Sequence, residues 1–213
     1  FGEATKIIPY ITEAPKKYQF QVNFGVATDT DDSCGQKIKT SKNRPTDIQI
    51  ENILRDFTGT IKQVPPQYSA VKLDGKRAYD LARSGVKELK FQARELHVEK
   101  LTLIERIGPG SVKMEMICGK GGYVRSIARD IGEKLGCFAH ADFIRRISSG
   151  PFTLANSISS KLIFEENITK IFQNLLPIQS PLNKMQGYNC LASDAYKLKN
   201  GKEILVHQKN LEE

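Results

Sequence analysis

Residues 118–152, CGKGGYVRSIARDIGEKLGCFAHADFIRRISSGPF, decide the fold because a strand end, a glycine-rich turn and a helix follow one another within them. From Val112 to Cys118 apolar residues alternate with mostly polar ones, which is typical of a half-buried strand that ends at the glycines. Gly136 is placed where a left-handed C-terminal cap is expected. The side chains that recur at helical spacing between these points are Val124, Ile127, Ala128, Ile131 and Leu135.

Tyr123 and Arg125 lie between the predicted strand and the predicted helix. Residues two apart in extended backbone project to the same side, so this spacing places an aromatic ring beside a cation. A tyrosine next to glycines is also compatible with half-buried packing, and an arginine near a helix start with a solvated surface charge. The spacing by itself leaves both interpretations open.

The composition indicates a globular protein with an excess of positive charge. The 213 residues include 32 lysines and arginines against 24 aspartates and glutamates, a net charge of +8, and 39% are hydrophobic. This is enough for one core and a small second domain. The charge favours a polyanionic partner, although a merely basic protein would look the same. Four scattered cysteines without a CxxC pair suggest a reducing cytoplasm.

No membrane or secretion signal is recognisable in these residues. The sequence contains no apolar run of the length that a membrane span requires, and no basic-then-apolar leader. It starts at Phe1 without an initiator methionine, which suggests a fragment of a longer chain. We therefore expect no membrane partner.

The upstream part predicts a strand, an acidic turn and a helix. Alternation over residues 19–27 predicts a strand that begins near Tyr18. Residues 28–35, TDTDDSCG, favour a turn with side-chain-to-backbone hydrogen bonds over a metal site, because carboxylates alone are weak metal evidence. Thr46 and Gln49 form a capping-box pattern ahead of a helical stripe that ends at Gly59.

The middle of the chain predicts a hairpin and an antiparallel strand pair. Residues 63–85, QVPPQYSAVKLDGKRAYDLARSG, indicate an extended start at two prolines, a strand over 68–73, a turn and a short helix. Lys72 belongs to a basic cluster at that turn, which either contacts phosphates or is simply exposed. An alternating run over 96–107 and the turn Gly108–Gly110 predict an antiparallel partner for the strand at Val112.

Several of these segments resemble the bacterial tRNA pseudouridine-55 synthases, the TruB family. Residues 118–146 resemble the pattern C-S-K-G-T-Y-I-R-T-L-A-D-D-L-G-E-x-L-G-C-G-A-H-x-x-x-L-R-R, and residues 63–85 resemble Q-x-P-P-x-Y-S-A-x-K-x-x-G-x-R-A-Y-x-x-A-R-x-G. The opening GEATK, the tyrosine at Tyr18 and residues 28–35 are similar to other family motifs. The family motif G-T-L-D-P, which carries the catalytic aspartate, is not among these residues.

The resemblance implies an α+β fold with a mixed, mainly antiparallel sheet and flanking helices. It also implies a catalytic domain over residues 1–152 that lacks its N-terminal part. A helical connector over 153–176 and the beginning of a small C-terminal RNA-binding domain over 177–213 are expected to follow.

The activity implied is the isomerisation of uridine to pseudouridine in the T-loop of tRNA, without cofactor or metal. By resemblance Arg125 is the catalytic partner of the absent aspartate, since a guanidinium pairs well with a carboxylate. Tyr18 is expected to stack on the uracil, and Tyr123 and Ile144 to close the slot around it, with Tyr123 also handling a proton. Lys72 is expected to bind the substrate RNA, whose target base must be flipped out.

Other functions are compatible with the same sequence. An RNA-guided pseudouridine synthase of the same superfamily is one, and a non-catalytic RNA-binding or RNA-folding module is another. A basic scaffold domain of a protein complex is a third. For the enzyme we expect a cytoplasmic monomer whose partner is the T stem-loop of tRNA.

Overall fold

The computed structural model describes residues 2–73, 75–86, 89–161, 168–182, 187–205 and 211–212. The chain forms two compact units, one over Thr5–Ser157 and one composed of Phe1–Ala4 and Ile158–Glu213. The boundaries that the sequence suggests after residues 152 and 176 stay predictions.

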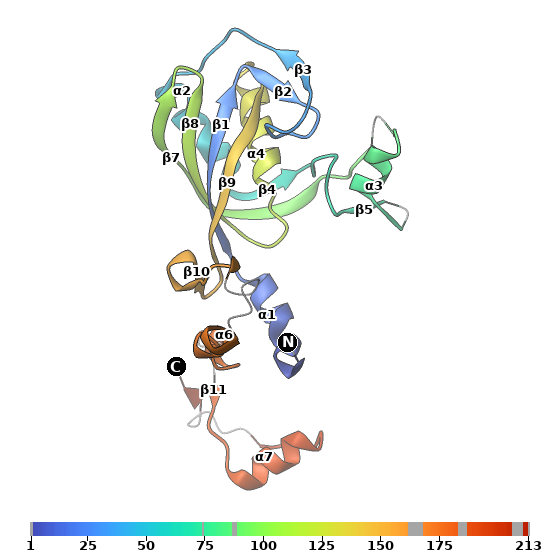
Figure 1. Cartoon of the computed structure of the whole chain (residues 1–213), viewed down its shortest axis with the longest axis vertical. Helices are drawn as coiled ribbons and strands as arrows, with labels where there is room; N and C mark the ends of the chain where they lie inside the picture. Colours follow the sequence, from blue (N-terminus) through green and yellow to red (C-terminus); the bar gives the residue numbers. More distant parts are fainter. Residues whose placement is uncertain are drawn as a thin grey trace. The chain divides into compact units, whose positions relative to one another are not determined.

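The larger unit is built on a six-stranded sheet with the order β10-β9-β1-β8-β7-β4 (Figure 1). Each described pair of neighbours in it is antiparallel, and one isolated bridge, between Asp32 and Ala141, is parallel. The α+β class with a mainly antiparallel sheet is thereby confirmed. The strands are β1 (Lys16–Phe24), β4 (Gly59–Gln63), β7 (Arg94–Gly108), β8 (Ser111–Cys118), β9 (Ala139–Ser149) and β10 (Phe152–Thr153).

Short helices and two small hairpins accompany this sheet in the chain up to residue 157. The hairpins are β2 (Val26–Thr28) with β3 (Lys37–Thr40), and β5 (Lys72–Leu73) with β6 (Lys76–Arg77). The helices and 3-10 turns up to residue 157 are η1 (Gly2–Ile7), α1 (Ile8–Glu13), α2 (Asp47–Leu54), η2 (Arg55–Phe57), α3 (Ala78–Arg83), α4 (Val124–Lys134) and η3 (Leu154–Asn156).

The second unit has little regular structure within the described residues. Its elements are α6 (Ile168–Gln173), η4 (Ser180–Leu182), β11 (Gly187–Tyr188), α7 (Ala192–Lys199) and β12 (Leu211–Glu212). Part of the helical stripe predicted after residue 157 falls on 162–167, outside the described residues. None of the described helices is long and apolar enough to cross a membrane.

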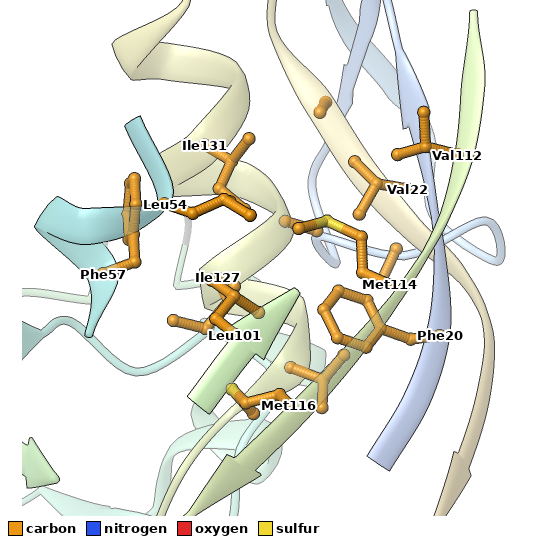
Figure 2. Packing of buried hydrophobic residues seen from close by; sticks show 14 of the residues in the cluster. Phe20, Val22, Leu54, Phe57, Leu101, Val112, Met114, Met116, Ile127 and Ile131 are labelled. Carbon is orange, nitrogen blue, oxygen red and sulfur yellow. The ribbon is translucent and has the colours of Figure 1, made fainter. Parts of the chain in front are cut away.

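The core lies between one face of the sheet and the helices α2 and α4 (Figure 2). Every second residue of β8 is buried, as the alternation predicted, and Phe20 and Val22 of β1 are fully buried beside them. From α4 the side chains of Ile127 and Ile131 are fully buried in the same cluster. Burial of large side chains such as these contributes about 1.5 to 3 kcal/mol each.

Two glycines and one threonine fix the ends of these helices. Gly136 has φ +62, the left-handed cap predicted after α4. Gly132 lets α4 approach the start of β9, because a Cβ there would overlap the backbone of Phe138 and Ala139. At α2 the capping box of Thr46 and Gln49 is present, so this prediction is confirmed as well.

The strand predicted over 68–73 is much shorter in the structure, where only Lys72 and Leu73 form β5. The backbone carbonyls before it have other partners. Ser69 and Val71 accept hydrogen bonds from the amides of Tyr79 and Ala78 at the start of α3, at 3.1 and 2.8 Å. The segment is thereby held to α3 rather than to a neighbouring strand, which an alternating pattern does not reveal.

Candidate active site

Arg125, in the first turn of α4, is held by three acceptors from two distant segments. Its Nη1 donates to the backbone oxygen of Thr30 and to Oδ2 of Asp32, both at 3.2 Å, and its Nη2 donates to the backbone oxygen of Tyr68 at 2.8 Å. The side chain is about one-fifth exposed, at 22%. A guanidinium fixed in this way, with N–H groups that have no partner in the described part of the chain, is preorganised for a further carboxylate.

Asp32 lies in the run of aspartates for which the sequence favoured a turn over a metal site, and its contact with Arg125 was not predicted. Its Oδ1 accepts from Thr30 Oγ1 at 2.7 Å and from the amide of Cys34 at 3.0 Å, while Oδ2 faces Arg125. The predicted turn with side-chain-to-backbone bonds is present, but the same carboxylate also orients the arginine. The aspartate-rich run itself was the available signal, because the chain has an arginine in a functional motif that needs an acidic partner.

The segment from Gln63 to Tyr68 also borders the site and lies along the N-terminal half of α4. Gln63 is buried and exchanges two hydrogen bonds with the backbone of Tyr123: its Oε1 accepts from the amide at 2.9 Å and its Nε2 donates to the carbonyl at 3.1 Å. The carbonyl of Val64 accepts from Ser126 Oγ at 2.8 Å. These bonds fix the backbone at the N-cap of α4.

Tyr123 is the N-cap residue of α4, with an extended backbone at φ −107 and ψ 109. It is half-buried and lines a cavity of about 250 Å³ together with Gln63, Leu96 and the basic residues Arg94 and Lys120. The structure therefore places Tyr123 and Arg125 at the same end of one helix, but Arg125 is already helical, so the extended backbone assumed for this pair ends at Tyr123. The placement of the ring beside the cation stays a prediction.

Tyr18 and Ile144 lie on the sheet face that α4 covers. Residues directly opposite in a ladder share a face, and Phe20, which is in the core, is opposite both Met114 and Ile144. Tyr18 is two residues earlier on β1, so it is on the same face, half-buried and packed against the core. Ile144 is 40% exposed, which leaves its side chain accessible at the edge of the covered area.

Lys72 is separate from this group. It is exposed on β5, opposite Arg77 of β6, and within the described residues no hydrogen bond or ion pair joins it to the other predicted site residues. Its role in binding RNA stays a prediction.

Next to Arg125 lies a second ion pair, one turn further along α4. Nη1 of Arg129 is 2.7 Å from Oδ2 of Asp31, and its Nε is 2.8 Å from Oδ1 of Asp130. Burial raises the pKa of Asp31 to about 6, against the opposing effect of Arg129. Burial would lower the pKa of Arg129, but Asp31 and Asp130 outweigh it, so the pKa of this guanidinium is raised.

The histidines have no catalytic arrangement in the described structure. Nδ1 of His140 is 2.9 Å from the backbone oxygen of Val26, and His97 is exposed on β7. Among the described residues there is no group of three or more histidine, cysteine, aspartate or glutamate side chains that could hold a metal ion.

Comparison with known proteins identifies the family to which this site belongs. Residues 1–124 match the model of the N-terminal domain of TruB family pseudouridylate synthases, and residues 125–182 match that of the tRNA pseudouridylate synthase B C-terminal domain. The chain belongs to the TruB family. The N-terminal match carries Tyr18, Asp32 and Tyr123, and the C-terminal match begins at Arg125.

Similar TruB proteins come from bacteria. A Ruegeria protein named tRNA pseudouridine synthase B is 47% identical over 212 residues, which are 99% of this chain and 70% of that protein. A protein of the same name from Cereibacter sphaeroides is 48% identical over the same shares of both chains.

Solved structures support the TruB fold. A Cbf5–Nop10–Gar1 complex contains a chain that superposes with a TM-score of 0.65 at 20% identity, over 93% of this chain and 52% of that one. An H/ACA RNP bound to a substrate RNA containing 2′-deoxyuridine gives a TM-score of 0.65 at 18% identity, over 94% and 51%. This chain spans about half the length of those chains, and the likeness concerns the fold alone.

Proposed function

We propose that this chain is part of a tRNA pseudouridine synthase that isomerises uridine 55 in the T-loop of bacterial tRNA. The observation that supports the proposal most directly is Arg125, fixed by Asp32 and two backbone carbonyls at the end of α4 in a chain of the TruB family. Its relatives at about 47% identity carry the name tRNA pseudouridine synthase B.

The reaction needs a carboxylate, a cation that orients it and a slot for the detached base. The bond between N1 of uracil and C1′ breaks, the ring turns, and C5 is joined to C1′; C5 loses its proton and N1 gains one, so no atom is added overall. Arg125 is the residue that keeps the attacking carboxylate ionised and aimed at C1′. Tyr18 offers the stacking surface, Tyr123 and Ile144 close the slot, and Tyr123 also handles a proton.

Asp32 suits an orienting role better than the role of the attacking carboxylate. Both of its oxygens are engaged, Oδ1 by Thr30 and the amide of Cys34, and Oδ2 by Arg125. Because both oxygens already have partners, neither is free to approach C1′. We expect the attacking aspartate to come from the family motif G-T-L-D-P, outside these 213 residues.

Net charge and the shape of the folded substrate both bear on how the RNA is bound. The net charge of +8 favours a polyanion, and the basic residues that we expect to contact the phosphate backbone include Lys72. The target base must leave its stack to reach the slot, so the substrate is the folded T stem-loop with the uridine flipped out. We expect a monomer that acts in the cytoplasm.

The test uses the full-length enzyme and tRNA labelled with tritium at C5 of uridine. We expect rapid tritium release by the unchanged enzyme, and loss of at least a hundredfold in rate for Arg125→Ala and Tyr18→Ala. Filter binding should show that both variants retain tRNA. The matched controls are Arg55→Ala and Tyr10→Ala, since both side chains are exposed and neither shares a described hydrogen bond, ion pair or cavity with the predicted site residues.

The alternatives give different outcomes in the same assay. A non-catalytic RNA-binding module would retain tRNA but release no tritium with the unchanged enzyme. An RNA-guided synthase would act only after a guide RNA is added. Normal release by Arg125→Ala or Tyr18→Ala would contradict the assigned roles.

A further inference from the structure

Two loops that are far apart in sequence converge on Arg125. One, from Thr28 to Asp32, supplies a backbone oxygen and a carboxylate, and the other, from Val64 to Tyr68, supplies a backbone oxygen. These loops are not paired with one another in any described sheet. Their relative position therefore depends on side chains that contact both.

Arg129 is such a side chain. Its Nη1 contacts the carboxylate of Asp31 at 2.7 Å and its Nη2 donates to the backbone oxygen of Val64 at 2.9 Å. The side chains of Arg129 and Asp31 are only 19% and 13% exposed. Arg129 and Arg125 are four residues apart on α4, so they lie on the same helix face and grip the same two loops.

The backbone of Asp31 makes this contact consequential. Asp31 has φ +60, a left-handed conformation that is strained for a non-glycine residue. Its amide donates to the carbonyl of Thr28 at 3.3 Å, and its own carbonyl accepts from Ala141 at 3.0 Å. Because Asp32 is the next residue, the conformation of Asp31 sets where the carboxylate that faces Arg125 is placed.

The contacts of Arg129 with Asp31 and Val64 form a brace between the two loops, and α4 supplies a third bond that orients it. Nε of Arg129 donates to Asp130 at 2.8 Å, so the guanidinium is held on three sides by Asp31, Asp130 and Val64. The compact ammonium group of a lysine does not match the directions of these three partners as the rigid planar guanidinium does.

We propose that Arg129 and Asp31 are positioning residues for pseudouridine formation, which lock the two loops that orient Arg125. This inference rests on the proposed function. Neither residue is placed against the uridine: both act through Arg125 and Asp32. Their loss should therefore slow the chemical step while leaving the binding of tRNA nearly unchanged.

The experiment measures single-turnover tritium release and tRNA affinity for full-length Arg129→Gln and Asp31→Asn. We expect the rate to fall at least tenfold in each and the tRNA dissociation constant to change less than threefold. Arg129→Lys should be faster than Arg129→Gln but slower than the unchanged enzyme. The double variant should be no slower than Arg129→Gln alone, because each single change already opens the same brace.

Arg106→Gln is the matched control. Nη2 of Arg106 is 2.6 Å from Oδ1 of Asp47 and donates to the backbone oxygen of Pro45 at 2.8 Å, so it too joins a carboxylate and a carbonyl. It belongs to the distal end of β7 and contacts neither loop. We expect a comparable loss of stability, measured by urea unfolding, with an unchanged rate.

The outcomes separate this inference from the proposed function. An unchanged enzyme that forms no pseudouridine refutes the proposed function and the positioning role with it. An active enzyme whose rate survives Arg129→Gln, or falls equally in Arg106→Gln, refutes the positioning role alone. An Arg129→Lys variant as fast as the unchanged enzyme would also refute it, because the planar geometry of the guanidinium would then be unnecessary.

Discussion

Replacement of Gln63 by leucine is the sharpest test of how the start of α4 is held. The Gln63 side chain is 3% exposed and forms two hydrogen bonds with the backbone of Tyr123, which caps the helix that carries Arg125. Leucine has a similar volume, so the change removes the polar contacts with little effect on packing.

The expected cost follows from what each Tyr123 group loses. Its carbonyl keeps a second partner, the amide of Ile127 at 3.2 Å, so loss of the bond from Gln63 costs about 0.5 to 1.5 kcal/mol. Its amide has no other partner in the described structure, and leaving this part-buried group unpaired costs about 1 to 3 kcal/mol. We therefore expect the free energy of unfolding to fall by about 1.5 to 4.5 kcal/mol.

Urea unfolding followed by far-ultraviolet circular dichroism measures this loss. The control is Gln19→Leu, since Gln19 belongs to the same sheet but donates only to Glu115, at 3.1 Å, on the face away from α4. Glu115 keeps Lys17 at 2.8 Å, so the control should lose about 1 kcal/mol or less. Equal losses in the two variants would refute the argument.

Three further changes test the fold and its electrostatics in the same unfolding assay. Gly132→Ala should lower the free energy of unfolding by about 3 kcal/mol, because the added methyl group meets the backbone at Ala139. Gly136→Ala should lower it by only about 1 kcal/mol, because the methyl group enters open space and only the positive φ is unfavourable. Equal losses would contradict this. Thr46→Ala should lower the free energy of unfolding by about 1 kcal/mol through loss of the capping box. No measurable change would show that the cap does not stabilise α2. The pKa of Asp31 is raised from 3.8 to about 6, so its contribution to stability is complete below about pH 4 and is lost as pH rises through about 6. Asp31→Asn should therefore flatten this part of the plot of unfolding free energy against pH. An unaltered slope would refute the assignment.

Charged side chains of α4 and β3 lie near Asp31. Arg129 opposes the rise of its pKa most strongly, Asp130 adds to it, and Arg125 opposes it. Lys39 and Glu133 line the adjacent cavity of about 60 Å³ with Asp31 and Arg129. Burial exceeds the combined effect of the charged partners, so the folded chain holds the Asp31 proton more tightly than the unfolded one.

Local pattern was sufficient for the regular elements around the candidate site. The alternation of β8, the helical spacing of α4 and the glycine after it depend on neighbours within a few residues, and the structure confirms all three. The strand predicted over 68–73 was too long, because its carbonyls bond to α3 and to Arg125 instead of a ladder. The placement of Lys72 in RNA binding stays untested.

The sequence by itself determined the family, the α+β class and the presence of Tyr123 and Arg125 at one helix end, since motifs and periodicity are local properties of the chain. Only the tertiary structure decided that Asp32 and Tyr68 hold Arg125 and that Asp31 and Val64 hold Arg129. These partners are 57 to 98 residues apart from the arginines. Contacts over such distances are set by how the sheet and α4 pack, which no local spacing encodes.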